Sequence, residues 1–283
     1  MDRILNNLFR GIGRMFPGCV TLSQAIAFNM FLAFFPMLLL VLGILSSHAS
    51  FHNALKELPD RLRLILPPGS EDVVVQYFVR KGQHPWKWFL LGLSGTLIAG
   101  SQVMSGFIEG FRVIEGDDIR PGYWRLQLRA LALLVLTFAP TLMVIALTVF
   151  GRQLRRWLVQ HFGLAILIHA LVFILQIAAV LVLSMTVLVL LYRIGRPGHK
   201  GNMDLLPGAA VATVLWWIVD ISFGLYVRTM PYDAVYGGLA AAIGLLLWMY
   251  LTAMVVLLGA AYNAEWRESH GELFATNNLM KLQ

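Results

Sequence analysis

The residues with the greatest chemical potential lie inside apolar stretches of the chain. Asp220 interrupts the apolar run that begins at Leu205, and Arg228 follows two helical turns later, roughly 12 Å along a helix axis. A carboxylate at membrane depth is costly, so it needs a partner, water or a proton. Uncharged polar side chains interrupt other apolar runs at Asn29, Gln102, His169 and Gln176. We expect these residues and Asp220 to line a pathway in which Asp220 binds a cation or a proton.

The same residues also have a structural interpretation. Asn, Gln and His side chains inside a membrane commonly hydrogen-bond a neighbouring helix. His169 and Gln176 are spaced to share one helix face, so either could be the partner of Asp220. A protonated or hydrogen-bonded Asp220 would then hold two helices together. Both interpretations are open on the sequence.

Spacing patterns that are typical of enzymes do not occur. The 7 histidines form no H-x-H or H-E-x-x-H pattern, and Cys19 is the single cysteine, so a cysteine metal cage and an intramolecular disulfide are excluded. The chain also has no phosphate-binding loop of the G-x-x-x-x-G-K-[ST] kind. We therefore expect no catalytic activity, no metal and no cofactor. A nuclease is disfavoured because phosphodiester cleavage would lack an activated nucleophile.

Composition places these residues in a membrane. Of the 283 residues, 58% are hydrophobic and 13% are charged, whereas soluble domains carry about 25% charged residues. An α-helix needs roughly 20 apolar residues to cross a bilayer. Such runs occur near residues 23–45, 88–108, 130–150 and 164–191 and in two arms of a hairpin over 205–263. The sequence predicts an all-α protein with six transmembrane helices in a single membrane domain over residues 1–283.

Amphipathic segments accompany these runs. In residues 3–16, seven apolar side chains fall on one side of a helix and Arg3, Arg10 and Arg14 on the other. Residues 1–18 are therefore predicted to form an interfacial helix that binds anionic lipid headgroups, although a helix packed on the bundle is the alternative. The loop over 46–87 is predicted to carry short amphipathic helices. The net charge of +7 suits headgroups rather than nucleic acid.

One face of the second predicted span consists mainly of small residues. Gly95, Ala99, Gly106 and Gly110 recur at helical spacing, with Gln102 in the same seam. Small residues allow a second helix to approach closely. We expect helix packing at this face, with a pathway-lining face as the alternative.

Short motifs are distributed along nearly the whole chain. Their central residues are Pro36, Pro207, Gly208, Tyr236, Gly237, Trp248, Tyr250, Gly259 and Asn263. As a set these motifs are specific, and they resemble those of the YihY/BrkB family of bacterial inner-membrane proteins. The family commonly has an acid directly after the Gly-Ala pair of the last span, where Ala261 stands here. If that acid has a general role, Asp220 or Glu265 would have to supply it.

The resemblance implies both termini in the cytoplasm and the 46–87 loop in the periplasm, a choice that the slight bias of Lys and Arg does not settle. Members of the family are described mostly as permeases or exporters linked to the cell envelope, and their old ribonuclease label is regarded as a mis-assignment. We expect a permease or exporter for an envelope-related, lipid-linked substrate. The alternative is an envelope scaffold that transports nothing. Whether the chain forms a homo-oligomer is open.

Overall fold

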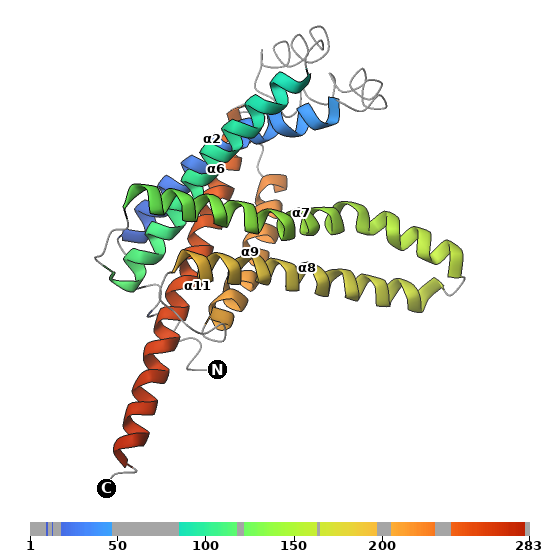
Figure 1. Cartoon of the computed structure of the whole chain (residues 1–283). Coiled ribbons are helices and arrows are strands. Elements are labelled where there is room, and N and C mark those ends of the chain that lie inside the picture. Colours follow the sequence, from blue (N-terminus) through green and yellow to red (C-terminus); the bar gives the residue numbers. More distant parts are fainter. Residues whose placement is uncertain are drawn as a thin grey trace. The chain divides into compact units, whose positions relative to one another are not determined.

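The computed structural model describes residues 10, 13, 18–46, 85–117, 122–162, 165–196, 205–229 and 239–280. The long elements in these ranges are all helices (Figure 1). They are α2 (Gly18–Ser46), α6 (Pro85–Glu115), α7 (Tyr123–Phe162), α8 (Ala165–Gly195), α9 (Leu206–Thr229) and α11 (Leu239–Met280).

Each long helix contains a stretch that can cross a membrane. The 6 candidate spans are Gly18–Val41, Phe89–Glu115, Tyr123–Met143, Phe173–Gly195, Leu206–Val227 and Ala240–Ser269. Many large apolar side chains on them point outward, and Ile221 is 69% exposed. Such exposure is unfavourable in water but carries no cost in hydrocarbon. The prediction of an all-α membrane protein with six spans is confirmed.

Helix α7 extends beyond both ends of the third predicted span. Helix α7 begins at Tyr123, ahead of the predicted start near Ala130, and it continues to Phe162 through Arg152, Arg155 and Arg156. A helix continues beyond an apolar run because its backbone hydrogen bonds do not depend on apolar side chains. Pro140 lies inside α7, as Pro36 lies inside α2.

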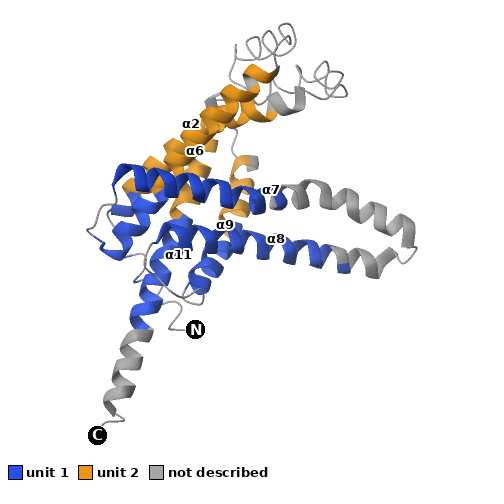
Figure 2. Ribbon diagram, viewed as in Figure 1, with its two compact units in different colours: residues 1–20, 107–217, 255–283 blue, residues 21–106, 218–254 orange. Residues whose placement is uncertain are grey.

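The described helices form two compact units (Figure 2). Unit 1 contains residues 1–20, 107–217 and 255–283, and unit 2 contains residues 21–106 and 218–254. Helices α2, α6, α9 and α11 each contribute to both units. That all 283 residues act as one membrane domain stays a prediction. Each unit is described by itself below.

In unit 1, α7 and α8 pack against each other, and the start of α9 packs closely on α11. A Cβ atom added to Gly259 would lie 2.6 Å from Ala212 Cβ and 2.7 Å from the carbonyl oxygen of Gly208. Both distances are too short for a real contact, so only glycine at position 259 permits this approach. The two helices meet at small residues, as is typical of helix pairs in membranes.

In unit 2, α2 packs along the small residues of α6. A Cβ atom on Gly92 would lie 2.5 Å from the backbone nitrogen of Leu40, and one on Gly95 would lie 2.8 Å from Pro36 Cβ. Gly106 meets Ile26 in the same way, with 2.8 Å to Cγ1. These glycines therefore let the two helices approach closely.

The remaining residues of the predicted seam have different environments. Gly110 belongs to unit 1 and faces the Leu257 side chain of α11. Ala99 is half-buried, and Gln102, expected inside the seam, is instead exposed. The predicted interfacial helix over 1–18 lies outside the described residues, apart from helical Arg10, Gly13 and Gly18. The predicted loop over 46–87 also lies outside them, except for Ser46 and the start of α6.

Candidate functional site

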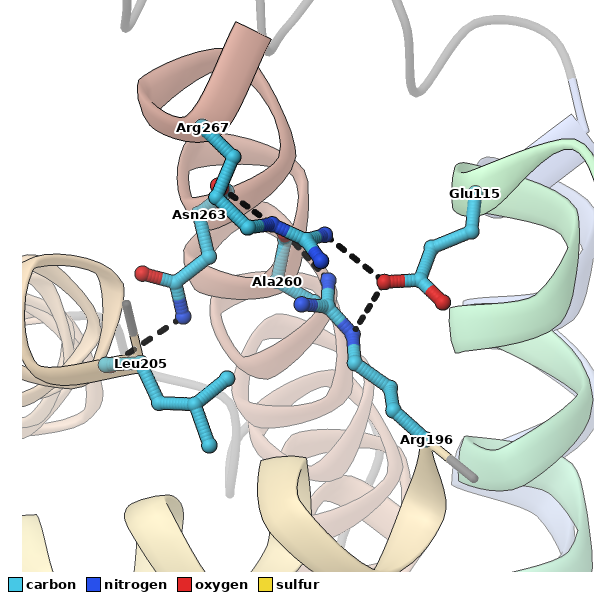
Figure 3. Close-up of polar contacts among 6 residues, drawn as sticks. All are labelled: Glu115, Arg196, Leu205, Ala260, Asn263 and Arg267. Carbon is cyan, nitrogen blue, oxygen red and sulfur yellow. Dashed lines mark hydrogen bonds and ion pairs between the residues drawn. The ribbon is translucent and has the colours of Figure 1, made fainter. Parts of the chain in front are cut away.

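Figure 3 shows a polar cluster in unit 1 formed by the side chains of Glu115, Arg196, Asn263 and Arg267. Four candidate spans begin or end near it: spans end at Glu115, Gly195 and Ser269, and another begins at Leu206. Because successive spans alternate in direction, all four points must lie at the same face of the membrane, the face at which the first span begins. The cluster is therefore placed near a boundary between hydrocarbon and headgroups.

Glu115 is the ionic centre of the cluster. Its Oε1 atom accepts a hydrogen bond from Arg267 Nη2 at 2.7 Å and lies 3.1 Å from Arg196 Nε. The Arg196 side chain is 1% exposed, and its Nη2 donates to the carbonyl oxygen of Ala260 at 2.7 Å. Arg112 in the last turn of α6 and Arg193 in the last turn of α8 also offset the partial negative charge of those helix ends. A buried guanidinium is tolerated here because an acid and a carbonyl oxygen meet it.

Asn263 extends the cluster to the start of α9. Its Oδ1 atom accepts from the backbone nitrogen of Gly208 at 2.7 Å, and its Nδ2 donates to the carbonyl oxygen of Leu205 at 3.1 Å. The first N–H groups of a helix have no partner within that helix, so Asn263 serves as a cap supplied by α11. Arg267 Nε in turn donates to the carbonyl oxygen of Asn263 at 3.2 Å.

Tyr192 makes a similar bond one turn before Arg196. Its hydroxyl donates to the carbonyl oxygen of Val256 at 2.8 Å, and its ring meets Phe111 edge to face, with 5.4 Å between centroids. A Cβ atom on Gly259 would collide with the Tyr192 hydroxyl. The motif glycine at 259 thus makes room for a tyrosine that joins α8 to α11.

These contacts give the cluster a holding role. Its side chains donate to one carboxylate and to backbone carbonyl groups of other elements, so they tie α6, α8, α9 and α11 together. Sequence reasoning missed Glu115, Arg196 and Arg267, because charged residues at span ends are usual. The available signal was that all three stand at one membrane face.

Unit 2 contains the second polar feature, a pair formed by Asp220 and Trp248. The indole Nε1 of Trp248 donates a 2.7 Å hydrogen bond to Asp220 Oδ1. Both side chains are half-buried. This hydrogen-bond partner of Asp220 comes from α11, 28 residues further along the chain, and the sequence alone did not point to it. The suggested pairing of Asp220 with His169 or Gln176 stays a prediction.

Trp248 also lines a groove of about 480 Å³. One wall consists of Phe223, Tyr226 and Val227 from α9, and the other consists of α11 residues between Ala240 and Trp248. The lining is mostly apolar, with Tyr226 and Trp248 as the residues that carry polar side-chain atoms. Asp220 is not part of it, so an occupant of the groove would meet the indole before the carboxylate.

Asp220 lies in the second half of its span. It lies seven residues before Val227, where the span ends, which is a rise of roughly 10 Å. The groove residues continue toward that end of α9 and come from the start of the α11 span. The groove therefore occupies the half of this helical hairpin that is remote from the start of α9.

The other predicted pathway residues differ in their exposure. Asn29 is half-buried in unit 2, where Gln102 is exposed, and Gln176 is half-buried in unit 1. The side chain of His169 lies outside the described residues. In the described part of unit 2, the hydrogen bond of Asp220 goes to Trp248 rather than to another predicted pathway residue. No three of His, Cys, Asp and Glu in the described part of the chain are placed to hold a metal ion.

The motif residues also occupy distinct places. Pro36 contacts Gly95, Pro207 lies in the first turn of α9, and Tyr250 is half-buried in α11. Tyr236 and Gly237 lie outside the described residues. The other motif residues are those that join α9 to α11 or hold Asp220.

Several bacterial membrane proteins are similar to this chain. A UPF0761 membrane protein of Xanthomonas oryzae pv. oryzae (strain PXO99A) is 28% identical over 251 residues, which covers 84% of this chain and 55% of that protein. Relatives of the same description from Xanthomonas campestris pv. campestris (strain B100) and Xanthomonas axonopodis pv. citri (strain 306) are also 28% identical. The chain spans about half the length of these curated relatives. No solved structure matches it.

The family comparison covers almost the whole chain. The family model described as Virulence factor BrkB matches residues 17–279, a range that includes all 6 candidate spans. This match agrees with the resemblance carried by the motifs. The chain therefore belongs to the Virulence factor BrkB family of membrane proteins.

Proposed function

We propose that this chain is a permease or exporter of the bacterial inner membrane for an envelope-related, lipid-linked substrate. The observation that carries the proposal is the acid Asp220 inside a span, bonded to a tryptophan that lines an apolar groove. An intramembrane acid next to a cavity is a common feature of substrate and ion pathways. The groove suits the apolar part of a substrate, and Asp220 is suited to a cation or a proton.

The orientation of the chain in the membrane is part of the same proposal. Both termini lie in the cytoplasm, and Arg3, Arg10 and Arg14 bind anionic headgroups there. The chain moves its substrate without catalysing a chemical reaction, and nucleic acid is not a partner. Energy comes from an ion gradient or from a partner protein.

A second candidate function is an envelope scaffold that transports nothing. The observation in its favour is unit 1, where Tyr192, Arg196 and Asn263 all bond to the backbone of other elements. Polar side chains used in this way hold helices in one arrangement. Under this alternative, the hydrogen bond between Trp248 and Asp220 is another such contact.

Reconstitution of the full chain into liposomes separates the two functions. One leaflet would carry a fluorescent phosphatidylglycerol or a fluorescent polyprenyl phosphate, and a proton or sodium gradient would be applied across the membrane. Quencher added outside would then report movement between leaflets. We expect the parent to move at least one of these lipids. Asp220→Asn keeps the shape of the side chain and removes its charge, so it should slow movement about tenfold, or about 1.4 kcal/mol in the barrier.

Asp117→Asn is the matched control, since it is the same change at an exposed acid beyond the end of α6. It should leave the rate of movement unchanged. A folded parent that moves neither lipid contradicts the proposed lipid transport and favours the scaffold. Equal rates for the parent and Asp220→Asn would remove Asp220 from the pathway.

A further inference from the structure

The groove and the acid of unit 2 are connected through a single side chain. We propose that the groove binds one hydrocarbon chain of a lipid, and that Trp248 is the positioning residue through which this chain acts on Asp220. The inference rests on the proposed lipid transport, and it names the part of the substrate that this site holds.

The position of the groove argues for hydrocarbon as its occupant. Its walls come from the last residues of the Leu206–Val227 span and the first residues of the Ala240–Ser269 span. The groove extends from these span ends toward the interior of the membrane. On the hydrocarbon side of the headgroup boundary the surroundings are lipid chains, and a polar occupant there would lose its hydrogen bonds to water. The mostly apolar lining offers a polar occupant few side-chain partners, since eight of the ten lining residues carry no polar side-chain atom.

The shape of the groove argues for a single chain. The α9 wall presents the rings of Phe223 and Tyr226, whereas the α11 wall contains the small residues Ala240, Ala241 and Gly244. A Cβ atom on Gly244 would meet only Phe223 Cζ, at an ordinary 3.8 Å. The small residues lie among the larger Ile243, Leu245, Leu247 and Trp248 of the same wall, and the two walls enclose a hollow of about 480 Å³, which a flexible chain can follow.

Trp248 connects this hollow to the acid. Its indole is part of the lining, and its Nε1 lies 2.7 Å from Asp220 Oδ1. A chain that enters the groove packs on the indole and fixes or shifts its orientation. Because the hydrogen bond depends on that orientation, the occupant changes the environment of the carboxylate without touching it. Removal of this donor leaves Asp220 available to a cation.

Binding can be tested on the purified full chain with palmitoyl-oleoyl phosphatidylglycerol as the probe. Native mass spectrometry after removal of bulk lipid should show one retained lipid on the parent. Gly244→Leu fills the groove and should weaken retention about tenfold. Gly224→Leu is the matched control on α9, because a Cβ atom there meets nothing within 4 Å, and it should retain the lipid as the parent does.

Coupling can be tested by infrared spectroscopy, with the carboxyl band of Asp220 assigned by its loss in Asp220→Asn. Adding the lipid to the delipidated parent should shift this band. Trp248→Phe keeps a ring in the groove but removes the N–H donor. It should therefore still bind the lipid, whereas its Asp220 band should not respond.

Three results would overturn the inference. In the first, Gly244→Leu retains as much lipid as the parent does. In the second, the parent binds no lipid and forms a dimer that Gly244→Leu abolishes. In the third, the infrared band of Asp220 does not change when the lipid is added. Transport that depends on Asp220 without such binding would refute this inference and leave the proposed function standing. Lipid binding that shifts the Asp220 band, without any transport, would support this inference and contradict the proposed function.

Discussion

The ionic centre of unit 1 should behave as one coupled group. Glu115→Gln preserves the shape of the side chain but removes the negative charge that lies 3.1 Å from Nε of Arg196, whose side chain is 1% exposed. Breaking a buried ion pair by removing one partner typically costs about 3–5 kcal/mol. Because Glu115 is 18% exposed and Arg196 retains the Ala260 carbonyl, we expect a loss of about 3 kcal/mol in the free energy of unfolding.

A double-mutant cycle tests the coupling directly. Arg196→Gln alone leaves Glu115 paired with Arg267 at 2.7 Å, so it should cost less than Glu115→Gln. The double variant removes the acid and the buried cation together. It should therefore be about 1–2 kcal/mol more stable than the sum of the two single losses predicts. The measurement is the unfolding of each variant in mixed micelles, followed by circular dichroism.

The pair of Glu109 and Arg112 provides a control on the same helix. These residues are three apart in α6, and the Glu109 side chain is 35% exposed. Pairs of this kind contribute only about 0.2–1 kcal/mol, so Glu109→Gln should have a small effect. If the losses of Glu115→Gln and Arg196→Gln simply add, or if Glu115→Gln costs no more than Glu109→Gln, the cluster does not hold the helix ends as described.

Three further predictions follow from the packing and the sequence. Gly92→Ala should destabilise unit 2 by about 1–3 kcal/mol because its Cβ atom meets helix backbone. Gly224→Ala places its Cβ atom in open space, so it should be neutral or stabilising by up to about 1 kcal/mol. Equal unfolding midpoints for the two variants would refute this prediction. Tyr192→Phe should cost about 1 kcal/mol through the loss of one buried hydrogen bond, and an unchanged midpoint would show that the bond contributes nothing. Replacing Arg3, Arg10 and Arg14 together with Glu should weaken binding of the amino-terminal segment to anionic vesicles, measured by the depth of spin labels. A uniform aqueous signal in the parent would exclude the interfacial helix.

The sequence by itself was enough to determine the class of the protein and the number of its spans. The reason is local, because a run of about 20 apolar residues has one favourable arrangement in a bilayer. The close-packing role of the glycines in the second span could also be predicted, because small residues at helical spacing allow close approach whichever helix packs against them. The resemblance in the motifs located the family for the same reason, as it depends on residue types and order alone.

The partners of the polar residues were decided only by the tertiary structure. Asp220 bonds Trp248, 28 residues away, and Arg267 bonds Glu115, 152 residues away. No local pattern selects such pairs, because they depend on which helix faces meet after folding. Gln102 was predicted to lie inside the glycine seam, but its side chain is exposed. Helical spacing places a residue near a packing face, but it does not decide which side chains the neighbouring helix covers. Helical periodicity places a side chain on a face, whereas only the packing of helices places another side chain opposite it.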